Sequence, residues 1–109
     1  MRAWHFVGDT LRNGDPIPKD GEKLLFPGTL VLGKQGLHAS LKPFDALQFA
    51  PGNVLCLVEM GGTIIHGDDK LVATERTILC RIDAEEMLAS AREDFNEMVY
   101  ECFSEWMED

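Results

Sequence analysis

The chain of 109 residues has few cysteines and no long apolar run. Cys56, Cys80 and Cys102 are odd in number, widely spaced and outside any CxxC or Cys/His pattern. That arrangement excludes a disulfide framework and the usual kind of zinc site. No run approaches the about 18 apolar residues of a membrane span, and the stretch after Met1-Arg2 is too short for a signal peptide. We expect a cytoplasmic protein with reduced thiols and no membrane partner.

The sequence also lacks the short motifs of common enzymes. None of the patterns GxxxxGK[ST], GxGxxG, HExxH and GxSxG occurs, so phosphate-loop, dinucleotide-fold, zincin and serine-hydrolase chemistries lose their usual support. The acids of Asp68-Asp69-Lys70 are too few for a calcium loop, which needs about six ligands, and a capped turn is the better interpretation. Basic residues stand singly, without a basic stripe. We therefore expect no metal, no cofactor and no direct contact with nucleic acid.

The net charge of the chain is −9, and this excess of negative charge comes from the C-terminal part of the sequence. Residues 83–109 contain ten acidic side chains and Arg92 as their only base, which gives −9. Residues 1–82 contain nine acidic and nine basic side chains, which gives zero. A localised charge creates a directional field that attracts cationic surfaces and repels nucleic acid and anionic membranes. The partner that we expect is therefore a basic protein surface.

Glycine and proline punctuate the first two thirds of the chain, whereas residues 83–109 contain neither. We expect one α+β domain over residues 1–109, with a neutral β-rich body at 1–82 and a long acidic amphipathic helix at 83–109. The body should form a small mixed or antiparallel sheet with one short helix. Strands are predicted at 4–7, 24–26, 30–32, 54–60, 63–65 and 77–82, with hairpin turns at Pro27-Gly28 and Gly61-Gly62. The short helix is predicted at 41–48, capped by Ser40 and stopped by Pro51-Gly52.

The acidic segment has the pattern of one long helix. Asp83 followed by Glu86 resembles a capping box, and apolar residues then recur at spacings of four and three, as in an amphipathic helix. The stripe consists of Ala84, Leu88, Ala91, Phe95, Met98 and Cys102, widened by Met87, Val99, Phe103 and Trp106. A helix that reaches Met107 would be about 37 Å long at about 1.5 Å per residue. We expect its first half, up to Phe95, to cover the sheet and the rest to pack on a partner.

Three stretches of the body are more specific than ordinary turns. They are Trp4-His5-Phe6-Val7, then Gly36-Leu37-His38-Ala39-Ser40 followed by Pro43, Asp45, Ala46 and Leu47, and finally Gly67-Asp68-Asp69-Lys70-Leu71. In this order they resemble an uncharacterised family of small bacterial and phage domains, over about residues 4–83. The resemblance implies a mixed α+β body and an origin in phage or other mobile DNA, with no activity attached. A phage-encoded protein would act in the cytosol of the host.

The same region is similar in layout to ADP-ribosyltransferases of the poly-ADP-ribose polymerase type. The motif at 36–40, the short helix and the strand at 54–60 follow the order of elements in those enzymes, whose first strand carries a histidine that holds nicotinamide. This resemblance implies His5, His38 and Glu75 as catalytic residues and a nicotinamide dinucleotide as ligand. Val7 stands where those enzymes have a hydroxyl residue, and His38 stands where they have a tyrosine. The alternative for both histidines is a hydrogen-bonded position in the core or at its rim.

We expect a non-enzymatic binding protein of phage type, an inhibitor that docks its acidic helix into the basic nucleic-acid groove of a host defence complex. Small acidic phage proteins that antagonise CRISPR or restriction complexes imitate nucleic-acid charge, and this chain is similar in size and in its concentrated carboxylates. The charge would come from Glu93, Asp94, Glu97, Glu101, Glu105 and Glu108. The apolar anchors would be Met98, Phe103, Trp106 and Met107. Two other hypotheses are the transferase-like enzyme or dinucleotide-binding domain, and an antiparallel homodimer through the C-terminal helix.

Overall fold

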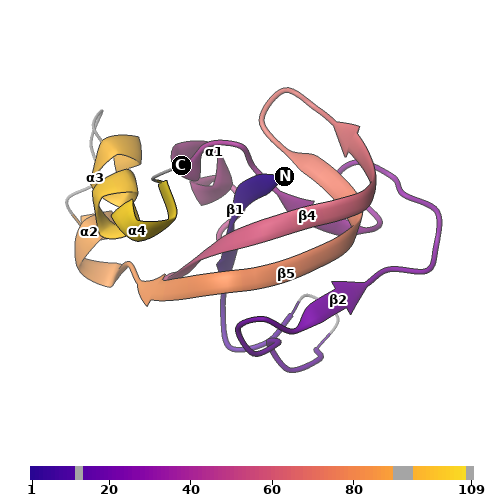
Figure 1. The fold of residues 1–109 in the computed structure, drawn as a ribbon, viewed down its shortest axis with the longest axis horizontal. Helices are drawn as coiled ribbons and strands as arrows, with labels where there is room; N and C mark the ends of the chain where they lie inside the picture. Colours follow the sequence, from indigo (N-terminus) through magenta and orange to yellow (C-terminus); the bar gives the residue numbers. More distant parts are fainter. Residues whose placement is uncertain (12–13, 90–94, 108–109) are drawn as a thin grey trace.

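The computed structural model describes residues 1–11, 14–89 and 95–107 and has the predicted α+β fold with a small antiparallel sheet (Figure 1). The strands are β1 (Arg2–Val7), β2 (Lys23–Leu25), β3 (Leu37–Ala39), β4 (Val54–His66) and β5 (Leu71–Asp83). The helices are α1 (Pro43–Leu47), α2 (Glu85–Ala89), α3 (Phe95–Cys102) and α4 (Ser104–Met107). None of the helices in these described ranges is long and apolar enough to cross a membrane.

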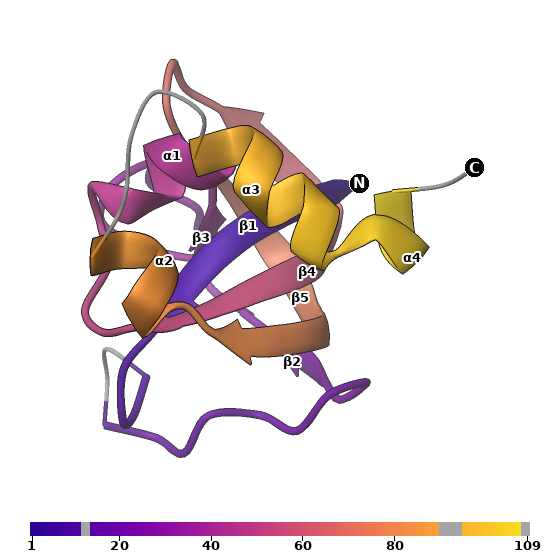
Figure 2. The ribbon, with the colours of Figure 1, turned by 90° about the vertical axis from the view of Figure 1, so that its left-hand side faces the viewer.

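The sheet is built on the long hairpin of β4 and β5, which have 13 residues each. The strand order is β1-β4-β5-β2, every pair is antiparallel, and β3 also pairs with β5. β1 and β3 meet as well, because Trp4 and Ser40 exchange two backbone hydrogen bonds of 2.7 and 2.8 Å. The contacts β1-β4-β5-β3-β1 therefore close part of the sheet into a small barrel, in which β1 and β3 lie next to each other (Figure 2).

Gly61-Gly62 does not form the predicted hairpin turn, and the long hairpin reverses instead at the turn predicted for Asp68-Asp69-Lys70. β4 continues through Gly61-Gly62, and its register against β5 shifts between Gly61 and Ile64. Gly62 has a φ of 70°, a conformation that favours glycine, so this pair forms a bulge that bends the strand instead of a turn that ends it. The turn is at Gly67–Lys70, where the Gly67 N–H donates to the Lys70 carbonyl at 2.8 Å. The predicted strand at 63–65 is therefore the second part of β4.

The segment between β2 and β3 also differs from the prediction. It has no hairpin turn at Pro27-Gly28, and the predicted strand at 30–32 is reduced to an isolated bridge between Val31 and Gln35. At Gly36 φ is 116°, and a Cβ atom there would lie 2.4 Å from Val72 Cγ2. Both the backbone conformation and the close approach require glycine at this position. Gly36 therefore fixes where the chain enters β3.

The predicted short helix is confirmed with a different cap. α1 begins at Pro43, whose fixed φ and missing N–H suit the first turn of a helix. The N-cap residue is Lys42, which makes no side-chain capping hydrogen bond. The Ser40 hydroxyl donates instead to the Asp69 carbonyl at 2.8 Å. Ser40 therefore joins β3 to the turn of the long hairpin and does not cap α1.

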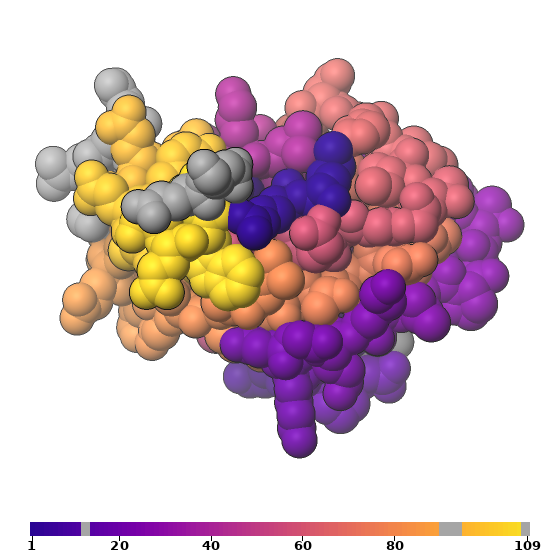
Figure 3. Space-filling model, viewed as in Figure 1, coloured from indigo at the N-terminus to yellow at the C-terminus, as the bar shows by residue number. Residues whose placement is uncertain are grey.

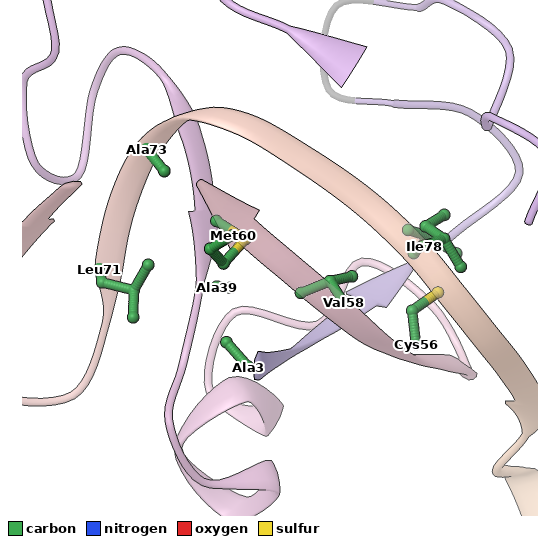
Figure 4. Close-up of a cluster of buried hydrophobic side chains, with 9 residues drawn as sticks. Ala3, Ala39, Cys56, Val58, Met60, Leu71, Ala73 and Ile78 are labelled. Atoms are coloured by element: carbon green, nitrogen blue, oxygen red, sulfur yellow. The ribbon is translucent and has the colours of Figure 1, made fainter. Parts of the chain in front are cut away.

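The two faces of the sheet carry separate hydrophobic clusters. The loop-side cluster lies inside the curve of the long hairpin and has small and medium side chains (Figure 4). Its buried members are Ala3, Val7, Ala39, Cys56, Val58, Met60, Leu71, Ala73 and Ile78. The helix-side cluster holds the large aromatic rings, and its buried members are Trp4, Phe6, Ala46, Leu55, Leu57, Ala84, Phe95, Val99 and Phe103. Successive residues of β1 and β4 supply the two clusters in alternation, as expected for strands that are buried on both faces.

The prediction of one long acidic helix is wrong. Among its described residues this segment forms α2, α3 and α4, of which α3 with eight residues is the longest. The longest dimension of the molecule is 37 Å, so a straight helix of about 37 Å would carry its far end away from the body. The short helices instead place Phe95, Val99 and Phe103 in the helix-side cluster with Trp4. The C-terminal residues accordingly lie against the N-terminal strand (Figure 3).

The start of the acidic segment follows the prediction more closely. Asp83 Oδ1 accepts a hydrogen bond of 3.0 Å from the Glu85 N–H and so caps α2. Ala84 is fully buried in the helix-side cluster, as a member of the apolar stripe should be. Cys102, which the sequence assigned to the same stripe, is exposed. The amphipathic pattern is therefore correct for part of the segment, although the single helix is not.

Candidate functional site

A pocket of about 910 Å³ lies beside β1 and β3. Its walls come from β1 and the residues after it, from β2 and the residues after it, from the stretch 33–40, and from α1. The polar side chains among its lining residues are His5, Asp9, Thr10, Asp15, Lys34, Gln35, His38, Ser40, Lys70 and Arg76. Ligand pockets usually measure about 300 to 1,000 Å³, so this one has room for a molecule of nucleotide size.

The opening arises because β1 and β3 part after a single point of contact. Trp4 and Ser40 form an isolated bridge, and no further pairing of β1 with β3 occurs among the described residues. On an antiparallel strand, residues two apart direct their N–H and C=O groups to the same side. His38 precedes Ser40 by two residues, so its carbonyl is directed toward the gap between the two strands.

Arg76 of β5 reaches this gap. Its Nη1 donates to the His38 carbonyl at 2.8 Å, and the residue is only 7% exposed. Burial lowers the pKa of the Arg76 guanidinium to about 10, against the opposing influence of the Cys56 thiol. Within the described parts of the chain, no carboxylate forms an ion pair with Arg76. A pocket wall therefore contains a buried cation whose contact is a neutral carbonyl.

Both histidines that the sequence singled out line the pocket. His38 Nε2 accepts a hydrogen bond of 2.8 Å from the Gly33 N–H, which assigns the proton of the neutral ring to Nδ1. His5 is in register with Cys56 of β4, between the buried Ala3 and Val7. Both rings are half-buried. The structure brings the two histidines to one pocket, and their roles there stay a prediction.

The third residue of the transferase-like set lies outside the pocket lining. Glu75 is the neighbour of Arg76 on β5, and neighbouring residues of a strand point to opposite faces. Its Oε1 forms an ion pair of 2.9 Å with Lys23 Nζ, and a Cβ atom added at Gly61 would lie 3.3 Å from the same oxygen. Glu75 therefore lies beside the bulge of β4, on the other face of the strand from Arg76. The structure does not bring His5, His38 and Glu75 together.

The mouth of the pocket combines charge with an exposed ring. Lys70 Nζ lies 4.8 Å from the ring centroid of Phe49, a cation–π contact, and Phe49 is 47% exposed. With Lys34 and Arg76, Lys70 gives the lining three cations. Asp9 and Asp15 give it two carboxylates. Among the described lining residues the pocket therefore has a small positive balance, although the whole chain is strongly acidic.

The acids predicted to dock on a partner are only partly within the described residues. Glu97, Glu101 and Glu105 are exposed on α3 and α4. Glu97 and Glu101 are four residues apart and therefore lie on one side of α3, whereas Glu105 belongs to α4. Glu93, Asp94 and Glu108 lie outside the described residues. An acidic outer face is therefore present in the described C-terminal helices.

The predicted apolar anchors contact the protein's own body instead. Phe103 is 2% exposed, with its ring centroid 5.0 Å from that of Trp4, so it presents no surface to a partner. Met98 and Trp106 are half-buried in the helix-side cluster, while Met107 is 36% exposed. Arg2 Nη1 donates to the Trp106 carbonyl, and the Arg2 guanidinium lies 5.6 Å from the Trp106 ring. Intramolecular packing therefore explains most of the apolar surface that the sequence assigned to a partner.

The described residues show neither a metal site nor activation of the thiols of Cys56 and Cys80. They contain no group of three or more His, Cys, Asp or Glu side chains that could hold a metal ion. The three cysteines are free thiols. Burial raises the pKa of Cys56 to about 11, with Arg81 and Arg76 opposing that rise, and burial also raises the pKa of Cys80. A raised pKa keeps a thiol protonated and unreactive at neutral pH.

Arg76 is the pocket residue that sequence reasoning missed. Its stretch, Thr74-Glu75-Arg76, matches no specific motif. The available signal is the period of two along the strand, since Arg76 and the buried Ile78 share a face of β5. An arginine in phase with core residues is unusual, because charged side chains are rarely buried unless they are paired.

Comparison with known proteins adds a family without an assigned activity. A family model described as "Domain of unknown function (DUF7666)" matches residues 1–90. No curated protein and no solved structure matches the chain. The matched residues include β1 to β5, α1, α2 and, in the part of the chain that the structure describes, every residue that lines the pocket, and they end before α3 and α4. The expectation of an uncharacterised family is therefore confirmed, and the pocket lies wholly within the family region.

Proposed function

The chain belongs to the DUF7666 family of domains of unknown function, and we propose that it is a non-enzymatic binding domain whose pocket accepts a small molecule of nucleotide size. The observation that carries this proposal is the pocket of about 910 Å³ in a protein of only 109 residues. Apolar side chains such as Leu24 and Phe26 line this pocket and are only half-buried. Small molecules usually bind in concave sites of this size, and a bound ligand would cover these side chains.

The lining supports a ligand with both ring and polar parts. Phe26 and Phe49 offer aromatic surface, while Lys34, Lys70 and Arg76 offer charged hydrogen-bond donors. A nucleotide or a nicotinamide dinucleotide has both kinds of part. The aromatic and polar lining therefore favours the dinucleotide-binding hypothesis over the other hypotheses for the body.

Group transfer is not part of the proposal, because the residue assigned to it lies elsewhere. Glu75 forms its ion pair with Lys23 on the other face of β5, and a carboxylate there cannot act on a ligand bound beside His5 and His38. A catalytic group must lie within hydrogen-bond reach of the atom on which it acts. We therefore expect binding of nicotinamide adenine dinucleotide without release of nicotinamide.

A titration followed by NMR tests the proposal. The ¹⁵N-labelled protein is titrated with nicotinamide adenine dinucleotide, adenosine monophosphate, adenosine and benzoate. Binding should shift the amide signals of Gly33, His38 and other lining residues and leave the helix-side residues unchanged. Thr10→Trp should abolish these shifts by filling the pocket from its rim, since Thr10 is an exposed lining residue. The matched control Thr29→Trp changes another exposed threonine that does not line the pocket, and it should preserve them.

Two results of this titration would contradict the proposal. One is the absence of shifts at lining residues with all four compounds. The other is a set of shifts that Thr10→Trp leaves unchanged, because such binding would take place outside the pocket. Detectable release of nicotinamide that disappears with Glu75→Gln would support the enzyme hypothesis instead.

A second candidate function is supported by the acidic outer face of α3 and α4. Glu97 and Glu101 are exposed on one side of α3, whose opposite side is buried in the body, and Glu105 is exposed on α4. Exposed carboxylates on packed helices can dock on a basic protein surface, such as the nucleic-acid groove of a host complex. With Phe103 buried, this docking would depend on charge and on Met107 at the rim, and not on a set of aromatic anchors.

A further inference from the structure

We infer that Arg76 is an anion anchor and that the ligand of the pocket carries an oxyanion, a phosphate or a carboxylate, next to a planar ring. This inference deepens the proposed function, on which it rests. Three observations carry it: where the guanidinium lies, what it has as neighbours, and what surrounds the rest of the pocket.

The first observation is position. The His38 carbonyl faces the gap between β1 and β3, because Ser40, two residues further on, pairs with Trp4 across that gap. The Arg76 guanidinium donates one N–H to this carbonyl and is thereby held at the inner end of the gap. Its other N–H groups form a planar fork that fits two oxygens of a carboxylate or phosphate.

The second observation is the lack of an acidic neighbour. Among the described residues, two other cations of the sheet form ion pairs: Lys23 Nζ lies 2.9 Å from Glu75, and Arg81 Nε lies 2.7 Å from Asp20. Arg76 is more buried than either and has no such ion pair among these residues. A buried charge without an opposite charge is costly, and proteins rarely keep one without a use for it. An oxyanion in the pocket would supply the missing charge.

The third observation is the composition of the mouth. Lys34 and Lys70 add positive charge, and Phe49 adds an exposed ring that Lys70 already contacts at 4.8 Å. Asp9 and Asp15 also line the pocket and set a limit on how much negative charge it accepts. A ligand with one oxyanion and one flat ring satisfies the guanidinium and the aromatic surface together.

Matched pairs of probes test the inference on the whole protein. Adenosine monophosphate is compared with adenosine, and benzoate with benzamide, so that each pair differs mainly in the negative charge. Affinities are measured by calorimetry or NMR titration. For at least one pair, the anion should bind about 10- to 100-fold more tightly than its neutral partner, as expected for a charge-assisted hydrogen bond. The pair that shows the preference distinguishes phosphate from carboxylate.

Two variants separate anchoring from general electrostatics. Arg76→Gln should remove the preference for the anion and leave the affinity for the neutral partner within about twofold. Arg81→Gln is the matched control, because it removes an arginine of the same strand that does not line the pocket. It should keep the preference. If Arg76→Gln does not fold, the Nε–H signal of Arg76 in the unchanged protein decides: it should shift with the anions and not with their neutral partners.

The outcomes are distinct for the two proposals. Equal binding of anion and neutral partner in both pairs would overturn the anion anchor and preserve the ligand-binding pocket. An anion preference that Arg76→Gln retains would do the same. No binding of any of these four probes at the pocket would overturn the anion anchor, and if nicotinamide adenine dinucleotide also fails to bind there, both proposals are overturned.

Discussion

The two faces of the sheet are closed in different ways. On the helix side, α1 and α3 cover β1 and β4 with interlocking rings, and Trp4 lies 5.0 Å from Phe103 and 5.9 Å from Tyr100 between ring centroids. On the loop side, the described residues between Gly8 and Gly36 include only one strand, the three-residue β2, and they cover the sheet incompletely. A pocket remains there, with a buried arginine in its wall.

This difference indicates a division of tasks between the faces. Large rings bury much apolar area, and the helix side therefore supplies most of the hydrophobic stabilisation. The loop side has small side chains such as Ala3, Ala39 and Ala73, and it includes features that lower stability, namely a hollow and an unpaired buried cation. The aromatic face offsets these costs. Functional sites commonly have this character, because binding needs groups that a purely structural core would exclude.

The largest expected effect on stability comes from a substitution in the helix-side cluster. Phe103→Ala should lower the free energy of unfolding by about 3–5 kcal/mol, because it removes a fully buried ring and leaves a cavity. Urea denaturation measures this change. Phe44→Ala is the matched control: Phe44 is 48% exposed and only touches Phe95 edge-on, so the same substitution should cost about 1 kcal/mol. Equal costs for the two variants would mean that Phe103 does not belong to the core.

The second prediction concerns a substitution at Gly36, where the chain enters β3 on the loop side. Gly36→Ala should cost about 2–5 kcal/mol, because φ is 116° there and the new Cβ atom would also overlap Val72 and Leu30. Gly21→Ala is the control, since φ is 86° at Gly21 but nothing lies within 4 Å of the added atom. It should cost about 1–2 kcal/mol, for backbone strain alone. Ligand binding at the pocket should weaken in Gly36→Ala, and a variant that binds as well as the unchanged protein would contradict this role of Gly36.

The sequence predicts the helix side better than the loop side, and the reason is physical. Apolar residues at helical and strand spacing identify β1, the central part of β4 and the inner side of α3, because burial selects for that spacing. A spacing pattern does not show whether a segment is one helix or three, nor which surface it covers. The side chains of Phe95, Val99 and Phe103 are therefore correctly predicted to be apolar, but the prediction assigns some of them to a partner and not to the body.

The candidate site is less accessible to sequence reasoning. His5 and His38 stand out by type, and both line the pocket. The gap that brings them together depends on a single bridge between Trp4 and Ser40, a tertiary contact across 36 positions that no local pattern encodes. Arg76 was passed over for the same reason, because its neighbours in space, and not in sequence, distinguish it from a surface arginine.

The third prediction tests how strongly the loop-side cluster excludes water from the Cys56 thiol. The pKa of Cys56 is raised by burial from 9.0 to about 11, so the folded state holds the thiol proton more tightly than the unfolded state. The associated stability is fully present below pH 9 and is lost as the pH rises toward 11. Between pH 8 and pH 10.5 the unchanged protein should lose about 1–2 kcal/mol more than Cys56→Ala. Cys102→Ala, at an exposed thiol, should keep the original dependence; an equal loss in Cys56→Ala would contradict the prediction.

The smallest expected effect on stability concerns the acidic outer face. Replacing Glu97, Glu101 and Glu105 by Gln should change the free energy of unfolding by no more than about 0.5 kcal/mol, because these side chains are exposed and Glu and Gln have similar helix propensities. Binding kinetics should respond much more. If this face docks on basic surfaces, association with immobilised poly-lysine should slow severalfold at low salt. Exposed charges of opposite sign act mainly on the rate at which the two partners associate.

A second triple variant decides whether the position of these charges matters or only their number. Glu22→Gln, Glu59→Gln and Asp68→Asn together remove three exposed acids from the body and change the net charge equally. Docking through α3 and α4 predicts that this control associates nearly as fast as the unchanged protein. Because exposed charges are screened beyond about 8 Å at physiological ionic strength, the difference between the triple variants should also shrink as salt is added. If both variants slow association equally, the acids of α3 and α4 are a solvated face that contributes net charge, and the pocket remains the functional surface of this molecule.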